Sequence, residues 1–181
     1  MGPFDYLFSF YGLLLGIAVA NVAIGFADMW RDCERIRVGT CPPILACIVL
    51  FGGMNVWLTT WQTRHDVALN GWQMLAAAGI ALPYVFVSRA MFPGQEREPE
   101  SSLEDHYLKH RVLILLLLVV RPVVSLVSKI LLDDIRYVGW REAWIAVRIV
   151  MPLALLAFRG VKAQRAGLAA FLAIEFVGLF R

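Results

Sequence analysis

Three ionisable side chains, Arg121, Arg148 and Glu175, lie inside long apolar stretches of the sequence. A charge in the hydrocarbon core of a bilayer is costly, so such residues face protein or water and commonly serve a function. At a helical rise of about 1.5 Å per residue, Arg121 falls near the membrane midplane and the other two fall at similar depths. The stretches that carry Arg148 and Glu175 are joined by a short turn and must be antiparallel. The sequence therefore predicts that Arg148 and Glu175 interact, whereas it reveals no partner for Arg121.

Further polar residues share helix faces with these charges, at spacings of i, i+4 and i+7. One predicted stripe is Asn55, Thr59 and Gln62, and the other is Arg121, Ser125 and Ser128; Asn21 also falls near the midplane. One interpretation is a water-accessible cavity, open to the outside, whose net positive charge suits an anion, a carboxylate or a lipid head group. The other is a set of hydrogen bonds between helices, each contributing about 0.6 kcal/mol. The sequence leaves both interpretations open.

Small residues follow a four-residue spacing in the first apolar stretch, at Gly12, Gly16 and Ala20. Small side chains in that register allow two helix backbones to approach closely. We expect these three residues to serve helix packing, and Gly52-Gly53 to act in a similar way in the second stretch.

The composition indicates a membrane protein. Of 181 residues, 60% are hydrophobic and 17% charged, with a mean hydropathy of +0.68, whereas soluble domains are about 45–50% apolar. A span needs about 20 mostly apolar residues, and six stretches qualify: approximately 4–29, 43–62, 71–92, 112–132, 142–159 and 163–180. The prediction is an all-helical, polytopic membrane bundle of about six transmembrane helices in a single domain, 1–181. These spans leave no room for a soluble catalytic domain, and we expect no enzyme activity, cofactor or nucleic-acid partner.

Charge asymmetry predicts the orientation of the spans. Lysine and arginine are about twice as frequent in the connections after the first, third and fifth spans as on the opposite side. Positive residues favour the cytoplasm, so both termini are predicted on the periplasmic side. No cleavable signal peptide is evident. The cysteines Cys33, Cys41 and Cys47 match no metal spacing and are interpreted as free thiols.

The predicted cytoplasmic segment 93–111 joins a polar loop to a helix extension. Ser101-Ser102-Leu103-Glu104 has the pattern of a capping box at its start. His106 and His110 share one face of this extension and could hold a metal, but a solvated helix surface explains them better.

Two segments of the sequence carry a resemblance. Tyr11–Ala18, with the sequence YGLLLGIA, and Leu103–Arg111, with the sequence LEDHYLKHR, resemble small uncharacterised bacterial integral membrane proteins with six spans. The resemblance implies the six-span architecture and a location in the bacterial inner membrane. No activity is assigned to that group, so it supplies no site residues.

Two functions are consistent with the sequence. The first is a channel or transporter for a small ion or anionic solute, with Arg121, Arg148 and Glu175 along its path. The second is a non-catalytic subunit of a larger inner-membrane complex, respiratory or photosynthetic. The expected partners are the lipid bilayer and either further copies of the chain or the other subunits of a complex.

Overall fold

The computed structural model describes residues 2–31, 38–62, 64, 70–93, 102–131 and 140–180. All regular secondary structure within these ranges is helical. The six helices are α1 (Pro3–Arg31), α2 (Cys41–Gln62), α3 (Gly71–Ala90), α4 (Leu103–Leu131), α5 (Trp140–Ala157) and α6 (Val161–Gly178). Helices α1 to α4 are each long and apolar enough to cross a membrane. The structure confirms the predicted all-helical membrane bundle, and its helices match the six predicted stretches.

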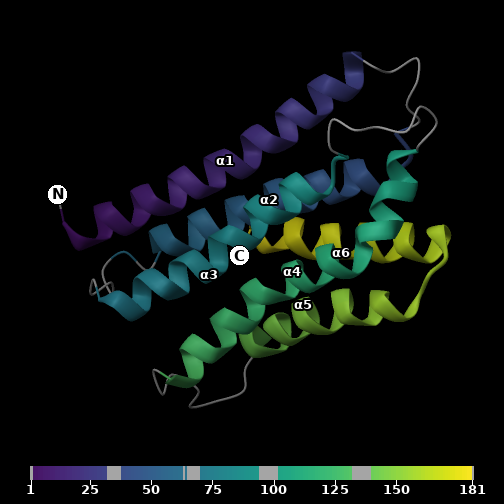
Figure 1. Ribbon diagram of the computed structural model, residues 1–181. Coiled ribbons are helices and arrows are strands. Elements are labelled where there is room, and N and C mark those ends of the chain that lie inside the picture. The colour runs from purple at the N-terminus through teal and green to yellow at the C-terminus, as the bar shows by residue number, and fades with distance from the viewer. Residues whose placement is uncertain are drawn as a thin grey trace.

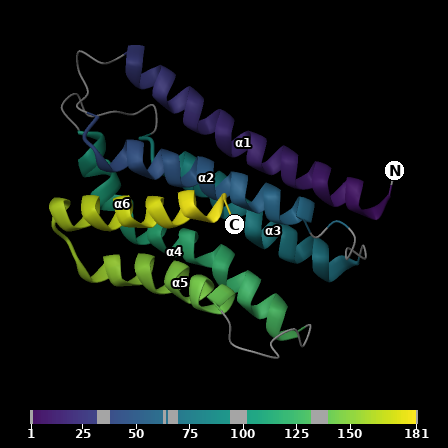
Figure 2. The ribbon, with the colours of Figure 1, turned by 180° about the vertical axis from the view of Figure 1, so that it is seen from behind.

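The helices pack side by side with their long axes roughly aligned (Figures 1 and 2). Helix α1 lies at one edge of the bundle and packs against α3 and α2, and α4 packs between α3 and α5. Helix α6 packs against α2 and α5. Helix α6 runs back toward the end of the bundle at which α1 begins, and it ends near the middle of the bundle in this view (Figure 1).

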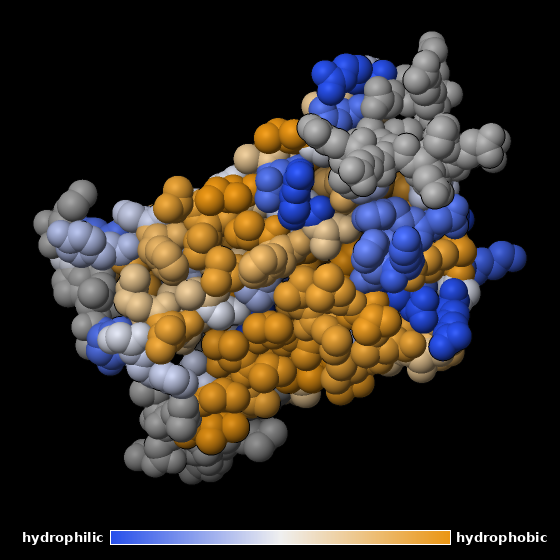
Figure 3. Space-filling view, viewed as in Figure 1, coloured by the Kyte–Doolittle hydropathy of each residue, from blue (hydrophilic) through white to orange (hydrophobic). Residues whose placement is uncertain are grey.

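The outer surface of the bundle is apolar around its middle (Figure 3). Large side chains on several helices are exposed there, among them Leu13, Leu75 and Val150. Polar residues gather toward the ends of the bundle, most clearly where α1 ends and α4 begins (Figure 3). Contiguous apolar surface of this kind is rare on soluble monomers and suits contact with lipid.

Local signals explain where α3 and α4 begin. The Asn70 side chain accepts a hydrogen bond from the backbone N–H of Gln73 at 2.8 Å, and the Ser102 hydroxyl accepts one from the N–H of Glu104 at 3.2 Å. Both bonds satisfy donors that a helix N-terminus leaves free. The predicted capping box differs in detail: Ser101 lies outside the described residues, and the Glu104 carboxylate turns to Arg165 on α6.

That contact ties the start of α4 to the start of α6. Arg165 donates to Glu104 from Nε at 3.1 Å and from Nη2 at 2.8 Å. These hydrogen bonds lower the pKa of the Glu104 carboxyl from 4.5 to about 2. Close by, the hydroxyl of Tyr107, three residues after Glu104, donates to Oε1 of Gln164, the residue before Arg165, at 2.7 Å; both residues are fully buried. Since α4 has 29 residues and a span needs about 20, these first turns precede the apolar stretch, in line with the predicted extension.

The small residues of α1 lie elsewhere than predicted. Gly12, Gly16 and Ala20 are exposed, and a side chain added at Gly12 or Gly16 would meet nothing within 4 Å. Helix α1 instead buries a neighbouring face, made of Leu7, Tyr11, Leu15, Ala18 and Val22. This face carries the larger apolar side chains, so its burial removes more apolar surface from solvent or lipid contact.

Candidate functional site

Five helices each contribute one polar side chain to a single cluster inside the bundle. The members are Asn55 on α2, Tyr84 on α3, Arg121 on α4, Arg148 on α5 and Glu175 on α6. The side chains of the two arginines are only 11% and 13% exposed, and that of the glutamate 4%. Charges buried to this degree require close partners of opposite sign.

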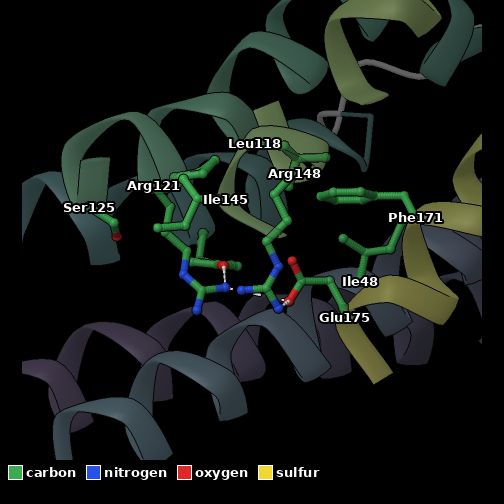
Figure 4. A pocket seen from close by; sticks show the side chains of 10 residues that line it. Ile48, Leu118, Arg121, Ser125, Ile145, Arg148, Phe171 and Glu175 are labelled. Atoms are coloured by element: carbon green, nitrogen blue, oxygen red, sulfur yellow. Dashed lines mark hydrogen bonds and ion pairs between the residues drawn. The ribbon is translucent and has the colours of Figure 1, made fainter. Parts of the chain in front are cut away.

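Glu175 is the centre of the cluster (Figure 4). Its Oε2 atom accepts from Nη2 of Arg148 at 3.0 Å, from Nη1 of Arg121 at 3.4 Å and from Nδ2 of Asn55 at 2.9 Å. The predicted contact between Arg148 and Glu175 is thus confirmed. Arg121, for which the sequence reveals no partner, shares the same carboxylate oxygen. The three ionised groups together carry a formal charge of +1.

The position of Glu175 near the end of α6 strengthens this arrangement. The last carbonyls of a helix lack intrahelical donors, and the N–H of Leu179 bonds to the carbonyl of Phe176 at 3.1 Å, so it turns away from that of Glu175. Nδ2 of Asn55 donates to the Glu175 carbonyl instead, at 2.7 Å. A helix C-terminus also carries partial negative charge. Both arginines therefore lie near a helix end that attracts cations.

Tyr84 is the member that sequence reasoning missed. Its hydroxyl accepts from Nη1 of Arg121 at 3.0 Å. A Cβ at Gly52 would lie 2.7 Å from the Tyr84 ring, so the absence of a side chain there lets the ring rest on α2. Gly178 likewise leaves room for Arg148 and Asn55. The sequence predicts close packing at Gly52. It gives no signal for Tyr84, because a tyrosine that binds a charged partner and an ordinary core tyrosine look alike in an apolar helix.

A small cavity of about 40 Å³ adjoins the cluster. Its lining comprises Ile48, Tyr84, Leu118, Arg121, Pro122, Ser125, Ile145, Arg148, Phe171 and Glu175 (Figure 4). A volume of this size holds a few water molecules or one small ion. Nε of Arg148 is buried and has no hydrogen-bond acceptor among the described residues. Nε of Arg148 thus keeps an N–H that a small acceptor could use.

The other predicted site residues lie away from this cavity. Asn21 donates to the Ser88 hydroxyl at 3.2 Å between α1 and α3. Thr59 is exposed and its hydroxyl donates to the backbone carbonyl of Asn55 at 2.7 Å. Ser128 borders a separate apolar groove between α3 and α4. Of the two predicted stripes, therefore, only Arg121 and Ser125 line the cavity.

The stripe on α2 diverges from the cavity because α6 ends early. Gly178, the last residue of α6, lies beside Asn55. The final turns of α2 continue beyond that point, and there Thr59 and Gln62 lie on the exposed face of the helix, whereas Thr60 is buried. Within the described residues, the two stripes do not join into one cavity open to the outside.

The two histidines of the α4 extension contact each other. The ring centroids of His106 and His110 are 4.6 Å apart, and Nε2 of His106 lies 3.1 Å from the carbonyl oxygen of Ala90, a distance at which the ring donates. No group of three histidine, cysteine, aspartate or glutamate side chains suited to a metal occurs in the part of the chain that the structure describes.

Comparisons with known proteins add no assignment. No family model matches the sequence, and no curated protein or solved structure matches it.

Proposed function

We propose that this membrane protein is a channel or transporter for a small anion or an anionic solute, with Arg121 and Arg148 as its binding groups. The observation that carries the proposal is the convergence of both guanidiniums on one oxygen of Glu175, at 3.4 and 3.0 Å, beside a polar cavity. A carboxylate offers arginine the same charge-assisted bonds as an anionic solute. Glu175 then acts as a tethered anion that fills the place of the solute.

Stability alone gives a weak account of the cluster. Replacing buried ion pairs by apolar residues of similar volume is often neutral or stabilising. Ionisable residues within membrane spans commonly mark solute or ion pathways. The formal charge of +1 and the free Nε–H of Arg148 favour an anion over a cation.

Two substitutions with opposite expected effects test the proposal. Arg121→Gln removes a charge-assisted contact and should lower chloride or acetate flux into proteoliposomes about tenfold or more. Glu175→Gln removes the competing anion and should tighten anion binding. A purely structural cluster predicts destabilisation by both changes and no anion binding by either protein.

The Glu104–Arg165 pair supplies a matched control, because it joins the same residue types at the end of the bundle. Glu104→Gln and Arg165→Gln should leave flux unchanged per folded protein. Absence of flux for chloride, nitrate and acetate in the wild type, together with no gain in anion binding by Glu175→Gln, would contradict the proposal.

A second candidate is a non-catalytic subunit of a larger inner-membrane complex. The small volume of the cavity, about 40 Å³, and the exposed apolar face around Gly12 and Gly16 favour it. Purification in a mild detergent separates the two functions. Stoichiometric partner polypeptides favour the subunit, whereas a homo-oligomer with anion flux favours transport. Both functions fit the expected bacterial inner membrane with periplasmic termini.

A further inference from the structure

An apolar groove of about 480 Å³ runs between α1 and α2, away from the charged cluster. Its lining is apolar and includes Gly12, Gly16, Val49, Gly53 and Trp57. Because side chains added at Gly12 or Gly16 would meet nothing within 4 Å, the space above these glycines is open. The groove therefore exposes backbone and small residues at a membrane-facing surface.

One end of the groove continues into an aromatic cluster. Trp57 lines the groove and also stacks on Phe8, with ring centroids 4.8 Å apart. Phe8 in turn packs against Trp61 at 5.6 Å, one helical turn beyond Trp57. The guanidinium of Arg64 lies 5.1 Å from the centre of the Trp61 ring. Tryptophan and arginine at a helix end are typical of the level of the lipid head groups.

The geometry points to a bound anionic phospholipid, with an acyl chain in the groove and its phosphate at Arg64. Trp61 lies one helical turn, about 6 Å, beyond Trp57, and the Arg64 guanidinium lies over its ring. Arg64 thus lies at one end of an apolar surface. This arrangement matches a phospholipid, in which the phosphate lies at one end of the acyl chain. Arg64 is exposed, and its Nη1 donates one hydrogen bond to the carbonyl of Trp61 at 3.3 Å. Its other N–H groups can therefore reach a phosphate.

The groove is long enough to hold part of an acyl chain. From Val49 to Trp57 the groove extends about 12 Å along α2. An acyl chain is narrow enough for this space, and the glycines allow it to lie against the backbone.

Native mass spectrometry of the purified protein, incubated with dioleoyl phosphatidylglycerol or dioleoyl phosphatidylcholine, tests this inference. We expect one retained phosphatidylglycerol per chain in the wild type. Gly16→Leu fills the groove and should lower the retained lipid about tenfold, by displacing roughly two methylene contacts. Arg64→Gln should abolish the preference for phosphatidylglycerol over phosphatidylcholine. Ala20→Leu, on the same helix but outside the groove lining, should retain the lipid.

Gly16→Ala serves as a milder variant, since the added methyl group meets no atom of the fold. Equal lipid retention in the wild type, Gly16→Ala and Gly16→Leu would overturn the inference. So would a Gly16→Leu protein that loses a second polypeptide, another copy or a different chain, while its retained lipid is unchanged. That result would identify the groove as a protein interface. None of these measurements depends on anion flux.

Discussion

At the scale of single residues, Asn55 has the most demanding position in the cluster. Its one amide nitrogen donates both to the carboxylate and to the backbone carbonyl of Glu175, at 2.9 and 2.7 Å. It therefore orients the side chain that neutralises two arginines and also satisfies the end of α6. Loss of this amide leaves a buried carbonyl without its described donor, which costs more than the loss of an exposed hydrogen bond.

We accordingly predict that Asn55→Ala lowers the free energy of unfolding by about 1–3 kcal/mol, measured in mixed micelles. Thr59→Ala is the control, because Thr59 is exposed one turn further along the same helix, and surface changes of this kind stay within about 0.5 kcal/mol. Equal losses for the two variants would show that the amide contributes no more than an exposed hydroxyl.

The sequence was sufficient to identify the charged members of the cluster, but only some of their contacts. The contact between Arg148 and Glu175 could be predicted because counting residues along two adjacent antiparallel helices places both side chains at a similar depth. The contact of Arg121 with the same oxygen depends on how α4 rotates and packs, which no local pattern specifies. Tyr84 could not be predicted for a related reason. Only its contact with Arg121, 37 residues away, distinguishes it from an ordinary core tyrosine.

At the scale of helices, glycine has two different roles in this bundle. Gly52 provides the close contact that places the Tyr84 ring on α2, whereas Gly12 borders open space on α1. The spacing of small residues instead pointed to α1 as the main site of close helix packing, since the regular four-residue series lies there. Which glycine is covered depends on the neighbouring helix, and α1 turns a face of larger side chains toward the bundle.

Matched glycine substitutions test this difference. Gly52→Ala should lower the free energy of unfolding by about 1–3 kcal/mol, because the methyl group must displace the Tyr84 ring. Gly12→Ala should be neutral or stabilise the protein by up to about 1 kcal/mol through helix propensity. Thermal unfolding of the two variants in the same detergent compares them directly. A more severe effect at Gly12 would contradict the assigned packing of α1.

The contact between the starts of α4 and α6 predicts a dependence of stability on pH. Hydrogen bonds from Arg165 lower the pKa of Glu104 from 4.5 to about 2 in the folded protein. The stabilisation by this carboxylate is therefore complete above the unfolded value and is lost as the pH falls from about 4.5 toward 2. Melting temperatures measured across this range should fall less steeply for Glu104→Gln than for the wild type. Parallel curves would exclude a contribution from the pair.

At the scale of the whole molecule, six helices require both termini on one side of the membrane. Positive-inside logic predicts that this side is the periplasm. We predict that alkaline phosphatase fused to either end is active, and that a fusion within the connection between α3 and α4 is inactive. Opposite results at the two termini would require an odd number of crossings.

The architecture was more predictable than the site, because span length and apolar content do not depend on tertiary contacts. Residues 112–132, for example, were predicted as a span with a helical extension before it, and α4 runs from Leu103 to Leu131 without interruption. The reach of α6 was harder to foresee. It ends beside Asn55, and beyond that point Thr59 and Gln62 lie on the exposed face of α2, outside the cavity.

The shared carboxylate also has a consequence for biosynthesis. Glu175 follows Arg121 by 54 residues and Arg148 by 27, so both arginines are synthesised before their counter-ion. Until then α4 and α5 carry uncompensated charges that disfavour entry into lipid. Insertion of α6 supplies the carboxylate that offsets this cost, so the stability of the cluster depends on all three helices together.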